Sequence, residues 1–177
     1  MSVDLETLFE SQGGVATTGQ LLTILSRSRL DIGIRDGEFI KVWSGIYARE
    51  EPDTIVRLRG LDLRAREPVA ICLATAAAAY GFDTEEVVDL HVLTPLGHQL
   101  RNSDGLVVHR RESAPLTEVD GRPATTPEWT AVEVARTLRR PRALATLDAA
   151  LRSGTCDRRR LRGRCPASGT AGHRART

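Results

Sequence analysis

The sequence predicts an α+β fold in three parts, and one observation supports each part. Residues 1–50 show helical spacing of apolar residues and then change to a short β-rich stretch. Residues 51–154 mix helical patterns with strand patterns, whereas residues 155–177 show no periodicity and almost no large apolar residue. We therefore expect two folded domains, 1–50 and 51–154, followed by a disordered, Arg-rich tail over 155–177.

The first domain is expected to begin with three helices. Apolar residues within 5–9 have helical spacing, and two glycines follow this first helix. Thr17 and Gln20 have the spacing of a capping box, which predicts that a short second helix begins there. Ser26 is a favourable N-cap for a third helix, and Gly37 is a favourable residue just after its end.

After residue 37 the pattern changes from helix to strand. Two β-rich runs, 39–43 and 46–48, are separated by Ser44-Gly45, which indicates a hairpin. A helix, a short helix, a third helix and a hairpin follow one another in the same order as in a winged helix-turn-helix domain. We therefore expect the N-terminal domain to have this fold.

The second domain is expected to combine helices and strands. Four elements are expected in its first part: helices over 55–66 and 69–80, and strands over 88–92 and 106–110. Thr126 followed by proline and glutamate is a typical helix start, and Pro141 breaks this helix. Leu144, Leu147 and Leu151 then predict the apolar side of a last helix.

Composition excludes several classes of protein. The chain has 177 residues, of which 41% are hydrophobic, so it can bury a core. No apolar run approaches the roughly 20 residues of a membrane span, and the acidic N-terminus is not a secretory signal. Three irregularly spaced cysteines fit neither a disulfide framework nor a zinc finger. We therefore expect a soluble, cytoplasmic protein with no membrane partner.

The formal net charge of +2 hides an asymmetry along the chain. Residues 157–177 hold seven Arg and one Asp, whereas the rest holds 18 basic and 22 acidic groups. Lys41 is the one lysine among 25 basic residues, a bias that a GC-rich genome also produces. The basic balance therefore says little about the folded domains.

The third helix carries the best candidates for contact with double-stranded DNA. If Leu30 and Ile34 face the core, a helical wheel places the opposite side over positions 28, 29, 32 and 35. Arginine and serine can bond guanine or phosphate there, and an exposed isoleucine would suit a thymine methyl group. The start of the second helix would contact phosphate, and the hairpin would contact phosphate or the minor groove. The candidate DNA-binding residues are Thr17, Thr18, Gln20, Ser26, Arg27, Ser28, Arg29, Ile32, Arg35, Lys41, Trp43 and Ser44.

The charge of this region supports DNA binding only weakly. Residues 26–49 hold five basic and three acidic groups, and Asp31, Asp36 and Glu38 would repel phosphate. Gly33 in the third helix also destabilises it by roughly 1 kcal/mol relative to alanine. A winged helix can serve as a protein-interaction module instead, so that alternative stays open.

Catalytic and metal-binding patterns are weak. His91 and His109 fall on strands that could be neighbours, with Asp89 nearby, while His98 lies between them. Exposed strand histidines are the interpretation we favour. The sequence contains no P-loop, no G-x-G-x-x-G and no H-E-x-x-H motif. We therefore predict no enzyme, no cofactor and no bound metal.

The order of motifs resembles the AbiEi family of antitoxins, the transcriptional regulators of type IV toxin–antitoxin systems. The resemblance covers about residues 8–154. Its motifs here read GGVATTGQLL, RDGEFIKVWSGIYA, DLHVLTP, GLVVHR, VDGRPATTPEWTAVEVAR and ALATLDAALRSG. It implies a regulator that represses its own operon, and a nucleotidyltransferase-like toxin encoded nearby.

Two departures from the family pattern leave an alternative open. Many relatives carry a polar triplet where this chain has Cys72-Leu73-Ala74-Thr75. Many actinobacterial relatives continue into a domain similar to very-short-patch-repair (Vsr) endonucleases, whereas here the Arg-rich tail follows. The alternative is a truncated remnant of such a nuclease-fused protein, without catalytic activity.

Overall fold

The computed structural model describes residues 4–82, 88–94, 100–110 and 113–164. The chain forms two compact units. The first unit comprises Met1–Val69 and Thr94–Leu100, and the second comprises Ala70–Leu93 and Arg101–Thr177. No helix in the described ranges is long and apolar enough to cross a membrane.

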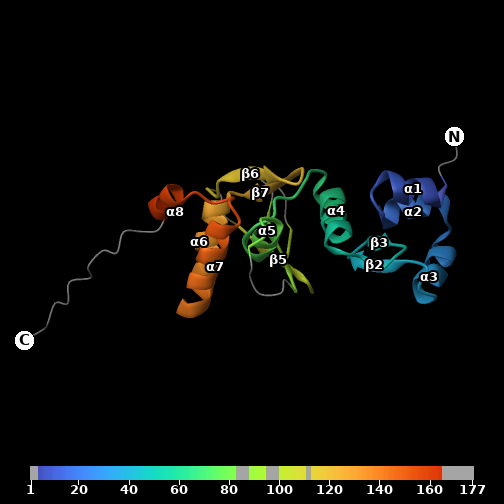
Figure 1. Cartoon of the computed structure of the whole chain (residues 1–177). Helices are drawn as coiled ribbons and strands as arrows, with labels where there is room; N and C mark the ends of the chain where they lie inside the picture. Colours follow the sequence, from blue (N-terminus) through green and yellow to red (C-terminus); the bar gives the residue numbers. More distant parts are fainter. Residues whose placement is uncertain (1–3, 83–87, 95–99, 111–112, 165–177) are drawn as a thin grey trace, which may run out of the picture. The chain divides into compact units, whose positions relative to one another are not determined.

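The first unit combines four helices with a three-stranded antiparallel sheet (Figure 1). Its elements are α1 (Leu5–Ser11), β1 (Val15–Thr17), α2 (Thr18–Ile24), α3 (Arg27–Arg35), β2 (Ile40–Trp43), β3 (Ile46–Ala48) and α4 (Thr54–Ala65). The strand order is β1-β3-β2, so β3 is the central strand. The expected order of three helices and a hairpin is confirmed, and β1, which is too short to show periodicity, is added to it.

The helix ends of this unit form where the capping residues predicted them. The Thr17 hydroxyl accepts from the Gln20 N–H at 3.3 Å, and the Gln20 side chain accepts from the Thr17 N–H at 2.9 Å. The Ser26 hydroxyl caps α3 by accepting from the Arg29 N–H at 3.3 Å. Gly37 has a φ of 79°, and the next N–H, that of Glu38, bonds the Gly33 carbonyl at 2.8 Å.

An apolar core holds these helices on the sheet. Its buried members are Leu8, Phe9, Ala16, Leu21, Leu30 and Phe39. The ring centroids of Phe9 and Phe39 are 6.2 Å apart. Helix α1, which carries Phe9, and the segment before β2, which carries Phe39, therefore meet at one aromatic pair. Gly33 lies against Phe39, because a Cβ at position 33 would come within 2.6 Å of that ring. Gly33 therefore offsets its weak helix propensity by allowing this close approach.

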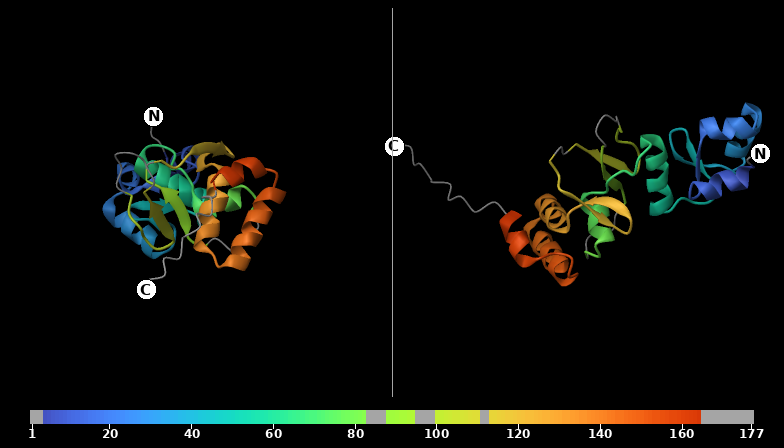
Figure 2. Two further views of the ribbon diagram at one scale, coloured as in Figure 1. Left: turned by 90° about the vertical axis from the view of Figure 1, so that its left-hand side faces the viewer. Right: turned by 90° about the horizontal axis from the view of Figure 1, so that it is seen from above.

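The described residues of the second unit form two strand pairs and four helices. Its elements are α5 (Leu73–Ala79), β4 (Leu90–Leu93), β5 (Leu106–His109), β6 (Leu116–Val119), β7 (Arg122–Thr125), α6 (Pro127–Thr137), α7 (Arg140–Arg152) and α8 (Arg158–Arg164). Strands β4 and β5 are parallel, whereas β6 and β7 form an antiparallel hairpin. Helices α6 and α7 pack together, as the views in Figures 1 and 2 show.

The apolar run from residue 69 is not one buried helix as expected. Ile71 is in extended conformation and forms isolated bridges with Val92 and Ala124, so α5 begins only at Leu73. The Ile71 N–H bonds the Pro123 carbonyl at 2.9 Å, and the Ile71 carbonyl accepts from the Thr125 N–H at 3.0 Å. These bonds satisfy the backbone outside a helix, which the apolar pattern alone did not reveal.

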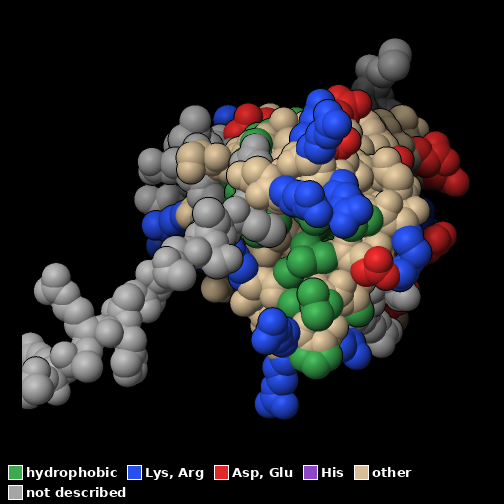
Figure 3. Space-filling view, turned by 60° about the vertical axis from the view of Figure 1, so that its left-hand side comes forward, with side chains coloured by type: hydrophobic (Ala, Val, Ile, Leu, Met, Phe, Trp, Pro, Cys, Tyr) green, Lys and Arg blue, Asp and Glu red, His purple; other side chains and the backbone are tan. Residues whose placement is uncertain are grey.

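Helix α7 buries a different side from the one its leucines predicted. Thr146, Ala149 and Ala150 are buried, whereas Leu144 is 61% exposed. The buried side of α7 is therefore lined by small side chains, and the helix packs with α6. Hydrophobic side chains accordingly show on the surface between basic ones in the view that brings this end forward (Figure 3).

The segment expected to be a disordered tail is helical in its first part. Asp157 accepts from the Arg159 and Arg160 N–H groups at 2.7 and 3.0 Å and so caps α8. Leu161 and Cys156 are buried, and they anchor a segment whose composition is otherwise basic. Two apolar side chains at suitable positions are enough to fix it, and the remainder, residues 165–177, lies outside the described residues.

Candidate nucleic-acid interface

The outer side of α3 carries the polar residues that the helical wheel placed there. Ser28, Arg29 and Arg35 are exposed, as is Arg27, and Ile32 is 42% exposed. Leu30, by contrast, is 2% exposed and packs into the core. The helix therefore presents two arginines, a serine and an isoleucine on one accessible surface. We call this surface the α3 face (Ser28, Arg29, Ile32 and Arg35).

Arg29 is held by a carboxylate that the sequence had identified only as a source of repulsion. Its Nη2 lies 2.5 Å from Glu38 Oε2, and the two side chains are 46% and 31% exposed. The contact spans nine residues across the turn after α3. Glu38 therefore lies next to the α3 face and contacts Arg29, the first of its two arginines.

The side chains at the start of α2 are already occupied within the unit. Thr17 donates to Gln20 Oε1 at 2.9 Å, and Gln20 Nε2 donates to Gln12 Oε1 at 2.9 Å. The Thr18 hydroxyl and N–H both bond the Gly45 carbonyl, at 3.3 and 2.9 Å. A phosphate at this helix start would have to compete with these hydrogen bonds, so the expected role of Thr17, Thr18 and Gln20 in contacting it is weakened.

The hairpin exposes two of its three candidates. Lys41 and Ser44 are exposed, but Trp43 is only 5% exposed and donates from Nε1 to the Arg57 carbonyl at 2.8 Å. The register of β2 on β3 shifts between Lys41 and Trp43, which turns these two side chains to opposite surfaces. The expected contact of Trp43 with DNA is therefore replaced by a structural role, packing the hairpin on α4.

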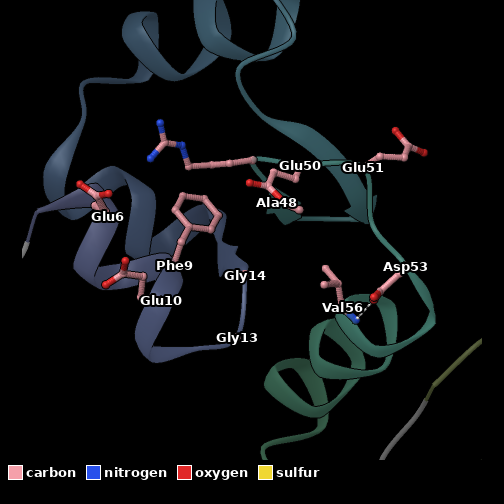
Figure 4. Close-up of a pocket in the computed structure, with 11 residues that line it drawn as sticks. Glu6, Phe9, Glu10, Gly13, Gly14, Ala48, Glu50, Glu51, Asp53 and Val56 are labelled. Carbon is pink, nitrogen blue, oxygen red and sulfur yellow. Dashed lines mark hydrogen bonds between the residues drawn. The ribbon is translucent and has the colours of Figure 1, made fainter.

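A groove of about 670 Å³ lies elsewhere in the first unit, between α1, the end of β3 and the start of α4 (Figure 4). Its floor includes Phe9 and Val56, and its rim carries the carboxylates of Glu6, Glu10, Glu50, Glu51 and Asp53. These carboxylates would repel phosphate. None of the candidate DNA-binding residues lines the groove, so it does not belong to the predicted interface.

The histidine pair of the second unit is joined by a hydrogen bond between rings. His91 Nδ1 lies 3.0 Å from His109 Nε2, and the ring planes differ by 15°. The ring centroids are 5.2 Å apart, so the two rings meet through one nitrogen atom of each. One of these two nitrogens donates its N–H to the lone pair of the other, so both are used by this contact. In the described residues no group of three or more His, Cys, Asp or Glu could hold a metal ion, and His98 lies outside them.

The burial of His91 leads to a pH-dependent stability. Burial lowers the pKa of His91 below its usual value of about 6.5, and Asp89 opposes that shift. The unfolded chain then binds the proton more tightly, so stability is present above pH 6.5 and is lost as pH falls below it. We expect the second unit to melt at a lower temperature at pH 5.5 than at pH 7.5, measured by Trp129 fluorescence. His91→Gln should remove part of this difference, and an unchanged pH dependence in that variant would contradict the assignment.

The second unit also contains a buried polar group that sequence reasoning missed. The Tyr80 hydroxyl donates to the Thr125 carbonyl at 2.8 Å, and burial, with Cys156 and Glu128 nearby, raises the pKa of Tyr80 to about 12. Burial likewise raises the pKa of the Cys156 thiol to about 11. Cys156 is a free, buried cysteine, and its thiol is therefore protonated at neutral pH. No local pattern marks this cluster, since its members are up to 76 positions apart in the printed sequence.

Comparison with known proteins identifies the family. The model of the AbiEi antitoxin C-terminal domain matches residues 69–177, more than half of the chain. The chain belongs to the AbiEi antitoxin family. The family match begins at residue 69, directly before the second unit, which begins at Ala70.

Relatives and a solved structure add to this assignment. Two curated proteins of Mycobacterium tuberculosis, uncharacterized protein MT2308 and uncharacterized protein Rv2248, are each 54% identical over 134 residues. That alignment covers 76% of this chain and 49% of each relative, so the chain spans about half the length of these curated relatives. The crystal structure of RV2827C protein from M. tuberculosis has a TM-score of 0.65 at 19% identity, over 88% of this chain and 67% of that one. The likeness to that structure shows a shared fold.

Proposed function

We propose that this antitoxin is a DNA-binding transcriptional regulator that represses its own operon. In this proposal the first unit is a winged helix-turn-helix, with α3 as the recognition helix and the β2–β3 hairpin as the wing. The observation that carries the proposal is the α3 face, where Arg29 and Arg35 are exposed beside Ser28 and Ile32. Family membership supports it, because regulation is the role of AbiEi antitoxins.

The roles within the interface follow from the chemistry of each side chain. Arg29 and Arg35 would bond guanine edges or phosphates, Ser28 either of these, and Ile32 would contact a thymine methyl group. Arg27 and Ser26 lie at the start of α3, which would approach the major groove first. Lys41 and Ser44 on the hairpin would contact the backbone and so fix the orientation of the helix in the groove.

The test is a footprint on the chain's own promoter, followed by affinity measurements at two salt concentrations. Replacing Arg29 or Arg35 by alanine should weaken operator binding by about 1–3 kcal/mol for each base-reading contact. Arg49→Ala is the matched control, because it removes the same charge from a residue that lines the acidic groove instead. Operator affinity that is unchanged in a folded Arg29→Ala/Arg35→Ala double variant would refute the assignment.

The second unit is proposed to serve the toxin side of the system. Its partner would be a nucleotidyltransferase-like toxin encoded nearby. The exposed Leu144 on α7 and the hydrophobic side chains that gather between basic ones in Figure 3 favour a protein contact for this unit, since apolar patches rimmed by polar residues are typical of interaction surfaces. Co-expression with the neighbouring gene tests this, because rescue of growth by the wild-type chain should be lost when Leu144 is replaced by glutamate in a folded variant.

A further inference from the structure

We propose that Glu38 is a positioning residue that sets the DNA sequence specificity of Arg29. The inference rests on the proposed function and deepens it. Glu38 makes no contact with DNA in this proposal. It acts through the guanidinium that it holds, by restricting where that group can place its N–H donors.

The carboxylate that holds Arg29 is itself fixed to α3. Both N–H groups that follow the turn, those of Glu38 and Phe39, bond the Gly33 carbonyl, at 2.8 and 3.2 Å. Phe39 then anchors the segment, since its ring is 1% exposed and lies against Gly33. The position of Glu38 relative to the helix is therefore set by backbone bonds and by the core, not by its own side chain.

The guanidinium of Arg29 is held by Glu38 and lies close to Gly33. Nη2 bonds Glu38, while Nη1 would be 3.2 Å from a Cβ at Gly33, so this end of the group lies over the helix backbone. A larger residue at position 33 would occupy that space. Of the five N–H donors of an arginine, the contact with Glu38 uses one, and the others are available for a base edge.

An exposed ion pair of this kind contributes little to folding stability, because solvent screens it and both side chains lose rotamer freedom. Its larger effect is on binding. An arginine that is already ordered loses less conformational entropy when it meets the correct base, and it reaches a displaced, incorrect base less easily. The carboxylate also repels phosphate, which lowers the affinity for DNA of any sequence. Both effects raise the ratio of specific to non-specific affinity.

Asp36 provides a matched control on the same turn. It is exposed, and no side-chain partner within the described part of the chain is found for it. Asp36→Asn and Glu38→Gln each remove one negative charge from nearly the same place, but only Glu38→Gln weakens the hold on Arg29. The two variants therefore separate general electrostatics from positioning.

The experiment measures the affinity of the full chain for two duplexes, the footprinted promoter site and a shuffled sequence of equal length. We expect both variants to bind the shuffled duplex more tightly than wild type. Glu38→Gln should lower the ratio of promoter to shuffled affinity by roughly tenfold, the size of one base contact, and Asp36→Asn should leave it unchanged. The melting temperatures of both variants should stay close to that of wild type.

Three results would overturn the proposal. An equal ratio in the two variants would show that Glu38 acts by charge alone. A higher ratio in Glu38→Gln would show that Glu38 competes with the operator for Arg29. If the wild-type chain itself showed no preference for the promoter site, the proposed function would fail together with this inference. The first two results, by contrast, would overturn only the role of Glu38.

Discussion

Phe39→Ala should destabilise the first unit by about 3–5 kcal/mol, the range for truncating a buried aromatic side chain. The ring is 1% exposed, stacks on Phe9 and fills the space that Gly33 leaves open. Its loss leaves a cavity between α1, α3 and the segment before β2. Such a change is a large fraction of the stability of a small unit.

The two tryptophans allow this change to be measured in one unit. Trp43 lies in the first unit and Trp129 in the second. Denaturant unfolding followed by fluorescence in a Trp129→Phe background therefore reports on the first unit. Ile55→Ala is the control, because Ile55 is 62% exposed and its truncation should stay within about 0.5 kcal/mol. A loss below 1 kcal/mol for Phe39→Ala would show that the aromatic pair is not central to the core.

Gly60→Val should destabilise the same unit by about 1–3 kcal/mol through overpacking. A Cβ at position 60 would lie 2.9 Å from Trp43 Cδ1 and 3.3 Å from Ile46 Cγ2. Trp43 cannot move aside cheaply, because its Nε1 bonds the Arg57 carbonyl and the Arg57 guanidinium lies 5.1 Å from its ring centre. Thermal unfolding followed by circular dichroism measures the change.

Gly19→Ala supplies the opposite expectation in a neighbouring helix. Position 19 is exposed in α2, and the nearest atom to a Cβ there is Thr17 Oγ1 at 3.9 Å. Alanine should therefore stabilise α2 by about 0.5–1 kcal/mol, since it lowers the entropy lost on folding.

If Gly60→Val proved as stable as wild type, the hairpin and α4 would have to separate without penalty.

The elements that could be predicted from the sequence are those fixed by local chemistry. Thr17, Ser26 and Gly37 each act within one helical turn, so their capping patterns predicted where α2 and α3 begin or end. The exposed side of α3 followed in the same way from the helical period. These predictions needed no knowledge of what packs against the helix.

The features that could not be predicted depend on partners distant in sequence. The burial of Trp43 requires the register shift in β2 and the presence of α4 below it. The contact between Arg29 and Glu38 requires the turn after α3 to bring two oppositely charged residues together. Leu144 looked like a core residue, but the buried side of α7 is formed by Thr146, Ala149 and Ala150. Periodicity identifies a helix and its faces, and only the neighbouring elements decide which face is covered.

One extended residue ties the strands of the second unit to one another. Ile71 bridges Val92 of β4 on one side and Ala124 of β7 on the other. The parallel pair and the hairpin therefore share one connecting segment, residues 70–72 just ahead of α5, in which Ala70 and Cys72 also bond the backbone of β4. Neither pair has a sheet of its own that is wide enough to persist alone, since isolated two-stranded sheets are marginal in water. We therefore expect both pairs to lose their strand structure together when residues 70–72 detach from them.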